Sequence, residues 1–267
     1  MAHPKKSLGQ NFLNNAKISQ RIIQSCDLSL SDEVLEIGPG RGALTRQLAP
    51  LVKRIIAVEI DRRLCEQLRQ ELKFNNLEIV CQDILRFDFS KVASKLKVIG
   101  NIPYYISTPI ISHLLGNKGK IDAIYLSLQK ELGLRAAALP GGKEYGAFSC
   151  FVQHHTEPEI LFPISKGCFS PQPKVDSVFV RLRVRPQPLI KVKDEEYFFK
   201  IIHAAFSQRR KTLGNALSAL LPKKELLTGL KALGIDPGLR AEKLTLGDFA
   251  RIADYFLLRK VDFCVGE

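Results

Sequence analysis

The sequence predicts an α/β fold in which a parallel sheet is followed by a small all-helical domain. In the first half of the chain, short apolar runs alternate with segments whose apolar residues recur at helical spacing. Beyond the closely spaced prolines Pro186 and Pro188, every apolar pattern has helical spacing. Strands that are apolar throughout are typical of a parallel sheet covered by helices on both faces. These observations define the predicted fold class.

The predicted elements follow one another in a regular order. The first helix is expected at residues 15–26, after a basic N-terminal arm, because Ile18, Ile22 and Ile23 fall on one helical face. Strands are expected at five apolar runs, residues 34–37, 55–58, 77–80, 97–99 and 121–128. Further helices are expected through Leu44 and Leu48, at residues 62–73, and around residues 129–139.

The pattern changes after a glycine-rich loop at residues 140–142. Three longer segments, residues 151–155, 159–162 and 178–184, are predicted to be strands added at the edge of the sheet. Alternate side chains of a strand point to opposite faces, so His154 and His155 could not share a ligand in this arrangement. We therefore interpret both histidines as structural.

A domain boundary is predicted at Pro186-Gln187-Pro188, because two prolines so close together disfavour both a helix and a central strand. Residues 1–185 would form the sheet-containing domain with its basic arm, and residues 186–267 the helical domain. Two apolar helical faces are visible in the second domain: Tyr197, Phe198, Ile201, Ile202, Ala205 and Phe206, and then Leu213, Ala216, Leu217, Leu220 and Leu221. A domain of this size is suited to capping a site or binding a partner.

The chain is strongly basic, because 40 Lys and Arg residues against 27 Asp and Glu residues give a formal net charge of +13. A polyanionic partner would explain this balance, but a basic surface without such a partner fits the composition equally well. No apolar run approaches the roughly 20 residues that span a bilayer. The start of the chain also lacks the apolar stretch of a signal peptide, so we expect a cytoplasmic protein.

The six cysteines are scattered, at Cys26, Cys65, Cys81, Cys150, Cys168 and Cys264, and none forms a C-x-x-C pair. This spacing indicates neither a zinc site nor a disulfide framework. We expect buried, reduced thiols and no bound metal.

Ligands of an open parallel sheet bind beyond the carboxyl ends of its strands, so the residues found there are the candidates for a site. The first predicted strand ends in Gly38-Pro39-Gly40-Arg41-Gly42, where a ligand can approach the backbone and the start of the next helix. Gly38, Gly40 and Ala43 also match the G-x-G-x-x-A fingerprint of nicotinamide dinucleotide sites. A purely structural tight turn is a further alternative.

The second and third predicted strands end in carboxylates. Glu59 lies about 20 residues after the glycines, where an acid can accept the ribose hydroxyl protons of either a dinucleotide or an adenosyl cofactor. Asp83 is flanked by Ile84 and Leu85 and could accept a hydrogen bond from an adenine amino group. An isolated acid in this position more often caps a helix, but three strand ends in register favour a binding site.

The fourth strand is followed by Asn101-Ile102-Pro103-Tyr104, which distinguishes between these cofactors. A hydride-transfer site would need a polarising His, Lys or Arg, whereas this stretch offers carbonyl oxygens and a ring. Carbonyl oxygens that accept both hydrogens of an adenine amino group would make its nitrogen a better nucleophile. Pro103 biases Ile102 to an extended conformation that aims its carbonyl outward, and Tyr104 could stack on an extruded base. The alternative is a proline-containing loop with core tyrosines.

With these residues in place, nearly the whole chain resembles the ribosomal RNA adenine dimethyltransferases of the KsgA (RsmA) type. The resemblance rests on seven motifs in family order: KKSLGQNFL, VLEIGPGRGALT, VEID, QDIL, NIPYYISTPI, FSPQPKVDSVFVRL and FSQRRKTLGNAL. It implies a Rossmann-like domain that uses S-adenosyl-L-methionine, followed by a helical RNA-binding domain at residues 186–267. The sequence departs from the family pattern at Tyr105, where many relatives carry Asn, but the Asn-x-Pro-Tyr core is intact.

The resemblance also implies roles for individual residues. The methyl donor would be bound by Asn11, Leu13, Gly38, Glu59, Asp83 and Asn101. The target adenine would be held through its amine by Asn101 and the Ile102 carbonyl, which Pro103 aims, and its ring would lie between Tyr104 and Phe169. The RNA would be contacted by Lys5, Lys6, Arg209, Arg210 and Lys211. A fully solvated helix face is the alternative for the last three.

The implied reaction is transfer of the sulfonium methyl group to N6 of adenine, twice per base, on two adjacent adenosines in the 3′-terminal hairpin loop of 16S small-subunit rRNA. The implied partner is rRNA in a pre-ribosomal particle during small-subunit biogenesis. The implied enzyme is a monomer that needs neither metal nor membrane. An Erm-type enzyme acting on large-subunit rRNA is one alternative, against which FSQRRKTLGNAL argues. A non-catalytic assembly factor is another, against which the intact residues at four strand ends argue.

Overall fold

The computed structural model describes residue 5 and residues 8–259, and the chain divides into two compact units. The first unit contains Met1–Gly133 and Glu157–Val184, and the second contains Leu134–Thr156 and Arg185–Glu267. The boundary after Val184 lies within one residue of the expected one. The division differs from the expected one at residues 134–156, because Tyr145 and Cys150 are part of the hydrophobic core of the second unit.

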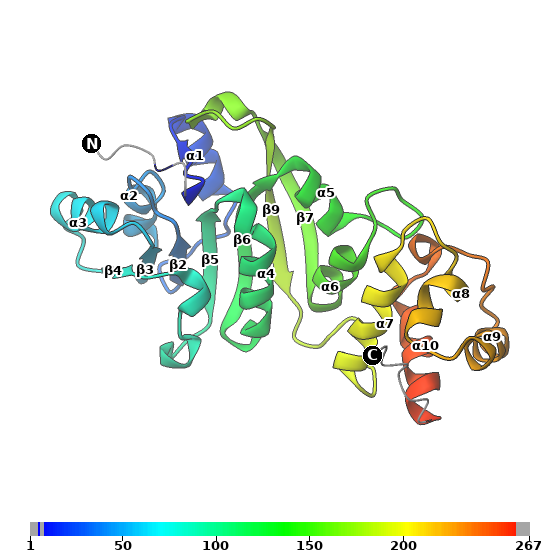
Figure 1. The fold of residues 1–267 in the computed structure, drawn as a ribbon. Coiled ribbons are helices and arrows are strands. Elements are labelled where there is room, and N and C mark those ends of the chain that lie inside the picture. Colours follow the sequence, from blue (N-terminus) through cyan, green and yellow to red (C-terminus); the bar gives the residue numbers. More distant parts are fainter. Residues whose placement is uncertain (1–4, 6–7, 260–267) are drawn as a thin grey trace. The chain divides into compact units, whose positions relative to one another are not determined.

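Within the described residues, the first unit is built around a seven-stranded sheet with the order β4-β3-β2-β5-β6-β9-β7 (Figure 1). Its strands are β2 (Glu33–Ile37), β3 (Arg54–Glu59), β4 (Leu77–Cys81), β5 (Leu96–Asn101), β6 (Ile121–Gln129), β7 (Thr156–Ile164) and β9 (Ser177–Val184). The first five are joined by parallel pairing, whereas β9 is antiparallel to β6. The five predicted parallel strands are confirmed, as are the added strands predicted at residues 159–162 and 178–184.

The strand order reverses at β2, whose neighbours β3 and β5 lie on opposite sides of it. Ile37, at the end of β2, pairs with Val58 of β3 and with Gly100 of β5. The strands carry apolar residues on both faces because both faces are covered, and Leu35 and Ile99 are among the buried residues. The residues that follow β2, β3 and β5 therefore meet at the switch point, where open parallel sheets bind their ligands.

Helices and short turns connect these strands. The helices are α1 (Ala16–Gln24), α2 (Thr45–Leu48), α3 (Arg62–Glu71) and α4 (Ser107–Gly116), and α5 (Lys130–Ala137) contains the boundary between the two units. Single 3-10 turns cover Ala49–Leu51, Ile84–Arg86, Phe89–Lys91, Tyr104–Ile106, Lys118–Lys120 and Lys166–Cys168. Asn15 caps α1 by accepting from the Ile18 N–H, and Asp61 caps α3 by accepting from the Arg63 N–H.

The N-terminal arm is attached to the first unit by a second, very short sheet. In it β1 (Phe12–Leu13) pairs in antiparallel fashion with β8 (Phe169–Ser170). The pairing places Leu13 opposite Phe169. The strand pairing of the arm is therefore with the segment that precedes β9, outside the main sheet.

The regular elements of the second unit, within its described residues, are helices, apart from Thr156 at the start of β7. It contains α6 (Ala147–His155), α7 (Glu195–Ser207), α8 (Leu213–Ala216), α9 (Lys223–Ala232) and α10 (Leu246–Leu258), with 3-10 turns at Leu217–Ala219 and Ala241–Lys243. Phe198 and Ile201 of α7 share one core with Phe249 of α10, as the predicted apolar faces require. A capping box of Thr245 and Asp248 begins α10. None of the helices in this part of the chain, nor any other described helix, is both long and apolar enough to cross a membrane.

The strand predicted at residues 151–155 is wrong, because these residues form the last turns of α6. A run of only five residues also fits a helical turn, and Phe148, Val152 and His155 recur at helical spacing and are buried. His154 and His155 therefore do not point to opposite faces of a strand. Both Nε2 atoms lie near Oε1 of Glu195, at 3.2 and 3.6 Å. Both rings also pack against Phe199. The expectation that the two histidines could not share a ligand is wrong, because their ring nitrogens and Glu195 lie within 4.8 Å of one another. Their interpretation as structural residues stays a prediction.

The cysteines of the described residues, Cys26, Cys65, Cys81, Cys150 and Cys168, are free thiols, and Cys264 lies outside these residues. Burial raises the pKa of the Cys150 thiol to about 12. This thiol is therefore protonated at neutral pH, which suits a core residue and not a thiolate ligand.

Candidate active site

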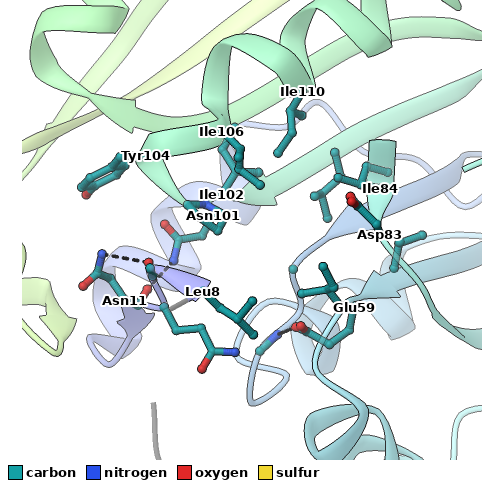
Figure 2. A pocket seen from close by; sticks show the side chains of 18 of the residues that line it. Leu8, Asn11, Glu59, Asp83, Ile84, Asn101, Ile102, Tyr104, Ile106 and Ile110 are labelled. Atoms are coloured by element: carbon teal, nitrogen blue, oxygen red, sulfur yellow. Dashed lines mark hydrogen bonds between the residues drawn. The ribbon is translucent and has the colours of Figure 1, made fainter. Parts of the chain in front are cut away.

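A cavity opens at the carboxyl ends of the central strands and has a volume of about 770 Å³, part of it open to solvent (Figure 2). Residues from the arm, from the glycine-rich loop and from the ends of four strands line it. Among them are most of the predicted site residues: Asn11, Gly38, Glu59, Asp83, Asn101, Ile102, Pro103 and Tyr104. The switch point of the sheet therefore carries a pocket lined by most of the residues that the sequence predicted for a ligand.

The glycine-rich loop after β2 needs glycine for two separate reasons. Gly40 has φ +59°, in the left-handed region, which costs another residue about 1–2 kcal/mol. A Cβ atom on Gly40 would also lie 2.9 Å from the ring of Phe12. This ring comes from the N-terminal arm, and its centre lies 4.8 Å from the Arg41 guanidinium, which is its cation–π partner. The loop and the arm are thus fitted to each other at the cavity.

Glu59, at the end of β3, is held at the cavity by two main-chain donors. Its Oε2 accepts from the Gly40 N–H at 3.2 Å, and its Oε1 accepts from the Asp61 N–H at 2.9 Å. The side chain is buried, and burial raises its pKa. A carboxylate has further lone pairs beyond the two used here, so Glu59 can still accept from the hydroxyls of a ligand.

Glu36 is a buried carboxyl group that sequence reasoning missed. It lies within β2, next to the residue that ends the strand, and its pKa is raised to about 7 by burial, with an additional contribution from the nearby charge of Glu59. Two acids therefore lie close together under the glycine-rich loop. The sequence offered one signal for this arrangement, because Glu36 is the sole charged residue inside the run VLEI.

Asp83 caps a turn and also lines the cavity. Its Oδ1 accepts from the Leu85 N–H at 2.9 Å and so caps the turn Ile84–Arg86. The same side chain lines the cavity beside Ile84 (Figure 2). The cap fixes the direction of the carboxylate, and its second oxygen is the one suited to contact a ligand.

The stretch after β5 is shaped by its own hydrogen bonds. The side-chain amide nitrogen of Asn101 donates to the main-chain carbonyl of Asn11 at 2.8 Å. The Pro103 carbonyl accepts from the Ile106 N–H at 3.3 Å and from the Ser107 hydroxyl at 3.2 Å. These two bonds start the turn that leads into α4. With the Pro103 carbonyl engaged, Ile102 is the better placed backbone acceptor for a ligand.

Tyr104 lies at the rim of the cavity, on the far side of Asn101 from Glu59 and Asp83 (Figure 2). Its hydroxyl lies 2.5 Å from the hydroxyl of Ser177, the first residue of β9. Burial raises the pKa of Tyr104, so its hydroxyl stays protonated near neutral pH. The ring is therefore fixed at both ends, by the turn at its Cα and by a hydrogen bond at its tip.

Phe169 and Leu13 are not brought to the cavity wall. Phe169 is 3% exposed and belongs to the hydrophobic core of the first unit, against which Leu13 also packs. The two residues face each other in the short sheet of β1 and β8. Their predicted roles at the base and at the methyl donor stay predictions.

The arm makes a charged contact beside the cavity that sequence reasoning also missed. Asp61 is buried and accepts from Lys5 Nζ at 3.2 Å, from Gln10 Nε2 at 3.4 Å and from Arg63 Nη2 at 2.8 Å. The Arg63 guanidinium, followed by Lys5, holds the pKa of this carboxyl well below its usual range. Lys5 therefore fastens the arm at the site, and Gln10 lines the cavity.

The remaining predicted RNA contacts lie in the second unit or outside the described residues. Lys6 lies outside the described residues. Arg209, Arg210 and Lys211 follow α7 and are exposed. Arg209 donates to the Lys143 carbonyl at 2.6 Å, so its guanidinium holds the loop before α6. Arg210 and Lys211 are therefore the two exposed cations of this cluster to which the prediction of RNA contacts applies most directly.

Known proteins are similar to this chain over nearly its whole length. The family model "Ribosomal RNA adenine dimethylase" matches residues 1–257. A protein of Moorella thermoacetica named "Ribosomal RNA small subunit methyltransferase A" is 42% identical over 263 residues, which are 94% of this chain and 91% of that protein. A protein of the same name from Listeria welshimeri is 43% identical over 94% of this chain and 90% of its own length.

Two solved structures are similar over nearly the whole chain. A dimethyladenosine transferase from Plasmodium falciparum has a TM-score of 0.82 and 28% identity, covering 94% of this chain and 99% of that chain. The 23S rRNA methyltransferase ErmE has a TM-score of 0.72 and 27% identity, covering 92% of this chain and 99% of that chain. The predicted fold class, a Rossmann-like domain joined to a smaller helical unit, is confirmed.

Proposed function

The chain belongs to the ribosomal RNA adenine dimethylase family, and on this premise we propose that it dimethylates N6 of two adjacent adenosines in the 3′-terminal hairpin loop of 16S rRNA. The methyl donor would be S-adenosyl-L-methionine. The observation that carries the proposal is the placement of Asn101, Ile102 and Tyr104 in one cavity with Glu59 and Asp83. Residues suited to an exocyclic amine and residues suited to an adenosyl group share this space.

Asn101 is the residue that activates the amine. Its amide nitrogen donates to the Asn11 carbonyl, so its Oδ1 is the atom available to accept from the target. The amine of adenine is a poor nucleophile because its lone pair is delocalised into the ring. When Oδ1 of Asn101 and the carbonyl of Ile102 accept its two hydrogens, the nitrogen gains electron density toward the donor. These bonds strengthen as the nitrogen becomes positive, which lowers the barrier to transfer.

The methyl donor fits the residues on the opposite side of the cavity. Glu59 would accept from the ribose hydroxyls and Asp83 from the adenine amino group, while Gly38 leaves room at the backbone. Ile84 and Ile110 supply apolar walls for an adenine ring. The bound donor supplies an already activated sulfonium methyl group. The protein therefore contributes position and polarity rather than a Lewis acid.

The proton that the amine releases passes to solvent. The lining of the cavity, as far as the described residues form it, contains no His or Lys side chain that would take it. The opening of the cavity to water provides the route.

The basic surface of the protein would bind the phosphate groups of the rRNA, since the chain has a formal net charge of +13. Arg210 and Lys211 of the helical unit and Lys5 and Lys6 of the arm are the proposed contacts, with Arg209 supporting the neighbouring loop. The substrate would be a pre-ribosomal particle in the cytoplasm, bound by the protein as a monomer. The proposed RNA-binding domain is residues 186–267.

The test is a map of methylated adenines in rRNA from cells with and without this protein. We expect the loss of dimethylation at two adjacent adenosines near the 3′ end of 16S rRNA, and its return when the gene is restored. The likeness to ErmE supplies the alternative outcome, in which the missing methyl groups are in 23S rRNA. Unchanged methylation in both rRNAs would contradict the proposal altogether.

A further inference from the structure

Ser177 has no part in the reaction described above, yet its hydroxyl lies 2.5 Å from the Tyr104 hydroxyl. The two residues are separated by 73 positions in the sequence and both belong to the first unit. Tyr104 lines the cavity, and Ser177 begins β9. The ring proposed to stack on the target base is therefore fastened at its outer end to a residue of the central sheet.

The backbone around Ser177 is fixed by the sheet and by the residue before it. Ser177 is fully buried and pairs with Gln129 of β6. The main-chain carbonyl of Asp176 accepts from the Lys130 N–H at 3.0 Å, and the side-chain Oδ1 of Asp176 accepts from the Lys166 N–H at 2.9 Å. The Ser177 hydroxyl is therefore a rigid hydrogen-bond partner for Tyr104, because the backbone that carries it has little conformational freedom.

The anchored bond fixes a ring that would otherwise have freedom to turn. Tyr104 follows the extended Pro103 and starts a single 3-10 turn, and such a turn constrains the backbone but not the side-chain torsions. Because Oη lies on the Cβ–Cζ axis of the ring, a hydrogen bond at Oη restrains the torsion about Cα–Cβ and so fixes where the ring lies. Precise position matters for a stacking partner, since a displacement of 1 Å can reduce a rate about 100-fold.

We propose that Ser177 is a positioning residue for methyl transfer, whose hydroxyl holds the Tyr104 ring at the place where it stacks on the target adenine. The inference rests on the proposed function. It makes Ser177 the counterpart of Asn11, because each holds one residue of the Asn-x-Pro-Tyr stretch from a distant part of the chain. One hydrogen bond joins the two hydroxyls. Removal of either hydroxyl breaks this bond and should therefore slow methyl transfer to the same extent.

The experiment compares Ser177→Ala, Tyr104→Phe and the double variant with the wild type. Methyl transfer from labelled S-adenosyl-L-methionine to small ribosomal subunits that lack the dimethylation gives kcat and KM, and calorimetry gives the Kd of the donor. Ser127→Ala is the matched control, because Ser127 is a buried serine of the adjacent strand β6 whose Oγ has no hydrogen-bond partner among the described residues. Thermal melting of each variant reports on folding.

We expect each single variant to lower kcat about 10-fold, with the donor Kd and the melting temperature unchanged. The double variant should be no slower than either single variant, since the same bond is removed in all three. A purely structural role for Ser177 would instead shift the melting temperature or the donor Kd together with kcat.

An unchanged kcat in Ser177→Ala overturns the inference, and so do reductions that multiply in the double variant, because the two hydroxyls would then act separately. Failure of the wild type to methylate either ribosomal subunit contradicts the proposed function instead. An active wild type that is insensitive to Ser177 contradicts the positioning role alone.

Discussion

The main-chain carbonyl of Asn11 accepts a hydrogen bond of 2.8 Å from the side-chain amide of Asn101. The bond joins the N-terminal arm to the end of β5 across 90 positions of sequence. A flipped amide would place its oxygen against the Asn11 carbonyl and break the bond. The arm therefore selects the orientation in which Oδ1 of Asn101 can accept from a target amine.

Replacement of Asn101 by the isosteric aspartate tests this orientation. Asn101→Asp keeps an acceptor but removes the donor to Asn11, and it places a carboxylate beside a carbonyl oxygen. We expect methyl transfer in single-turnover assays to fall about 100-fold, with the affinity for rRNA unchanged. Asn117→Asp is the control, because the Asn117 amide also donates to a main-chain carbonyl, that of His113, at the end of α4. An Asn101→Asp enzyme as fast as the control would refute the role of the bond.

Gly40→Ala should weaken both the fold and the binding of the methyl donor. The left-handed backbone at this position costs about 1–2 kcal/mol for alanine, and the added Cβ would lie 2.9 Å from the Phe12 ring. Urea unfolding gives the decrease in stability, and calorimetry gives the donor Kd, which should rise because the arm is displaced. Gly119→Ala serves as the control, because a Cβ atom added at Gly119 would have no neighbour within 4 Å. Equal stability and donor affinity in the two variants would contradict the tight fit of arm and loop.

The buried carboxyl of Glu36 should make stability depend on pH. Its pKa is raised from 4.5 to about 7, so the folded state binds its proton more tightly than the unfolded state does. The resulting stabilisation is complete below pH 4.5 and is lost as the pH rises toward 7, by about 3 kcal/mol. Glu36→Gln should reduce this decline in the curve of unfolding free energy against pH, leaving the part that Glu59 contributes, because burial also raises the pKa of Glu59.

The control for Glu36 lies on the same strand. A hydrogen bond from Lys53 lowers the pKa of Glu33, so Glu33→Gln should leave the decline between pH 4.5 and 7 in place. The same pH slope in the wild type and in Glu36→Gln would show that Glu36 is not the titrating group.

Arg210 and Lys211 should contribute to the salt dependence of rRNA binding. The double variant Arg210→Ala/Lys211→Ala is expected to flatten the plot of log K against log salt by about one unit for each phosphate group that it no longer binds. The double variant Lys91→Ala/Lys95→Ala, which removes two exposed lysines of the first unit, is the control for net charge. If both double variants change the slope equally, the cluster acts through net charge alone.

Arg209 should behave differently from its two neighbours. Its guanidinium donates to the Lys143 carbonyl, so Arg209→Ala should loosen the loop before α6. We expect a lower melting temperature of the second unit and a smaller effect on the salt slope than in Arg210→Ala. An unchanged melting temperature in Arg209→Ala would contradict the loop-supporting role and would indicate that Arg209 contacts phosphate groups as Arg210 and Lys211 do.

The parts of the site that could be predicted are those with a local signal in the sequence. A buried strand is a short apolar run, and the residue after it is fixed as soon as the run is recognised. Glu59, Asp83 and Asn101 were found in this way, and all three line the cavity. The prediction of a strand at residues 151–155 was wrong because the local signal was too short: five residues fit a strand and a helical turn equally well.

The supporting contacts could not be predicted because they join residues far apart in the chain. Lys5 and Asp61 are separated by 56 positions, and Tyr104 and Ser177 by 73. A single sequence contains no pattern that pairs them. A weaker signal did exist for Gln10 and Asp61, since they lie inside the motifs KKSLGQNFL and VEID.

The measurement that tests the central claim most directly is methyl transfer by Asn101→Ala. Purified wild type and variant would be given labelled S-adenosyl-L-methionine and small ribosomal subunits that lack the dimethylation. The wild type should label two adjacent adenosines near the 3′ end of 16S rRNA, whereas the variant should bind the subunits normally and label neither. Transfer by Asn101→Ala at a rate near that of the wild type would contradict the account.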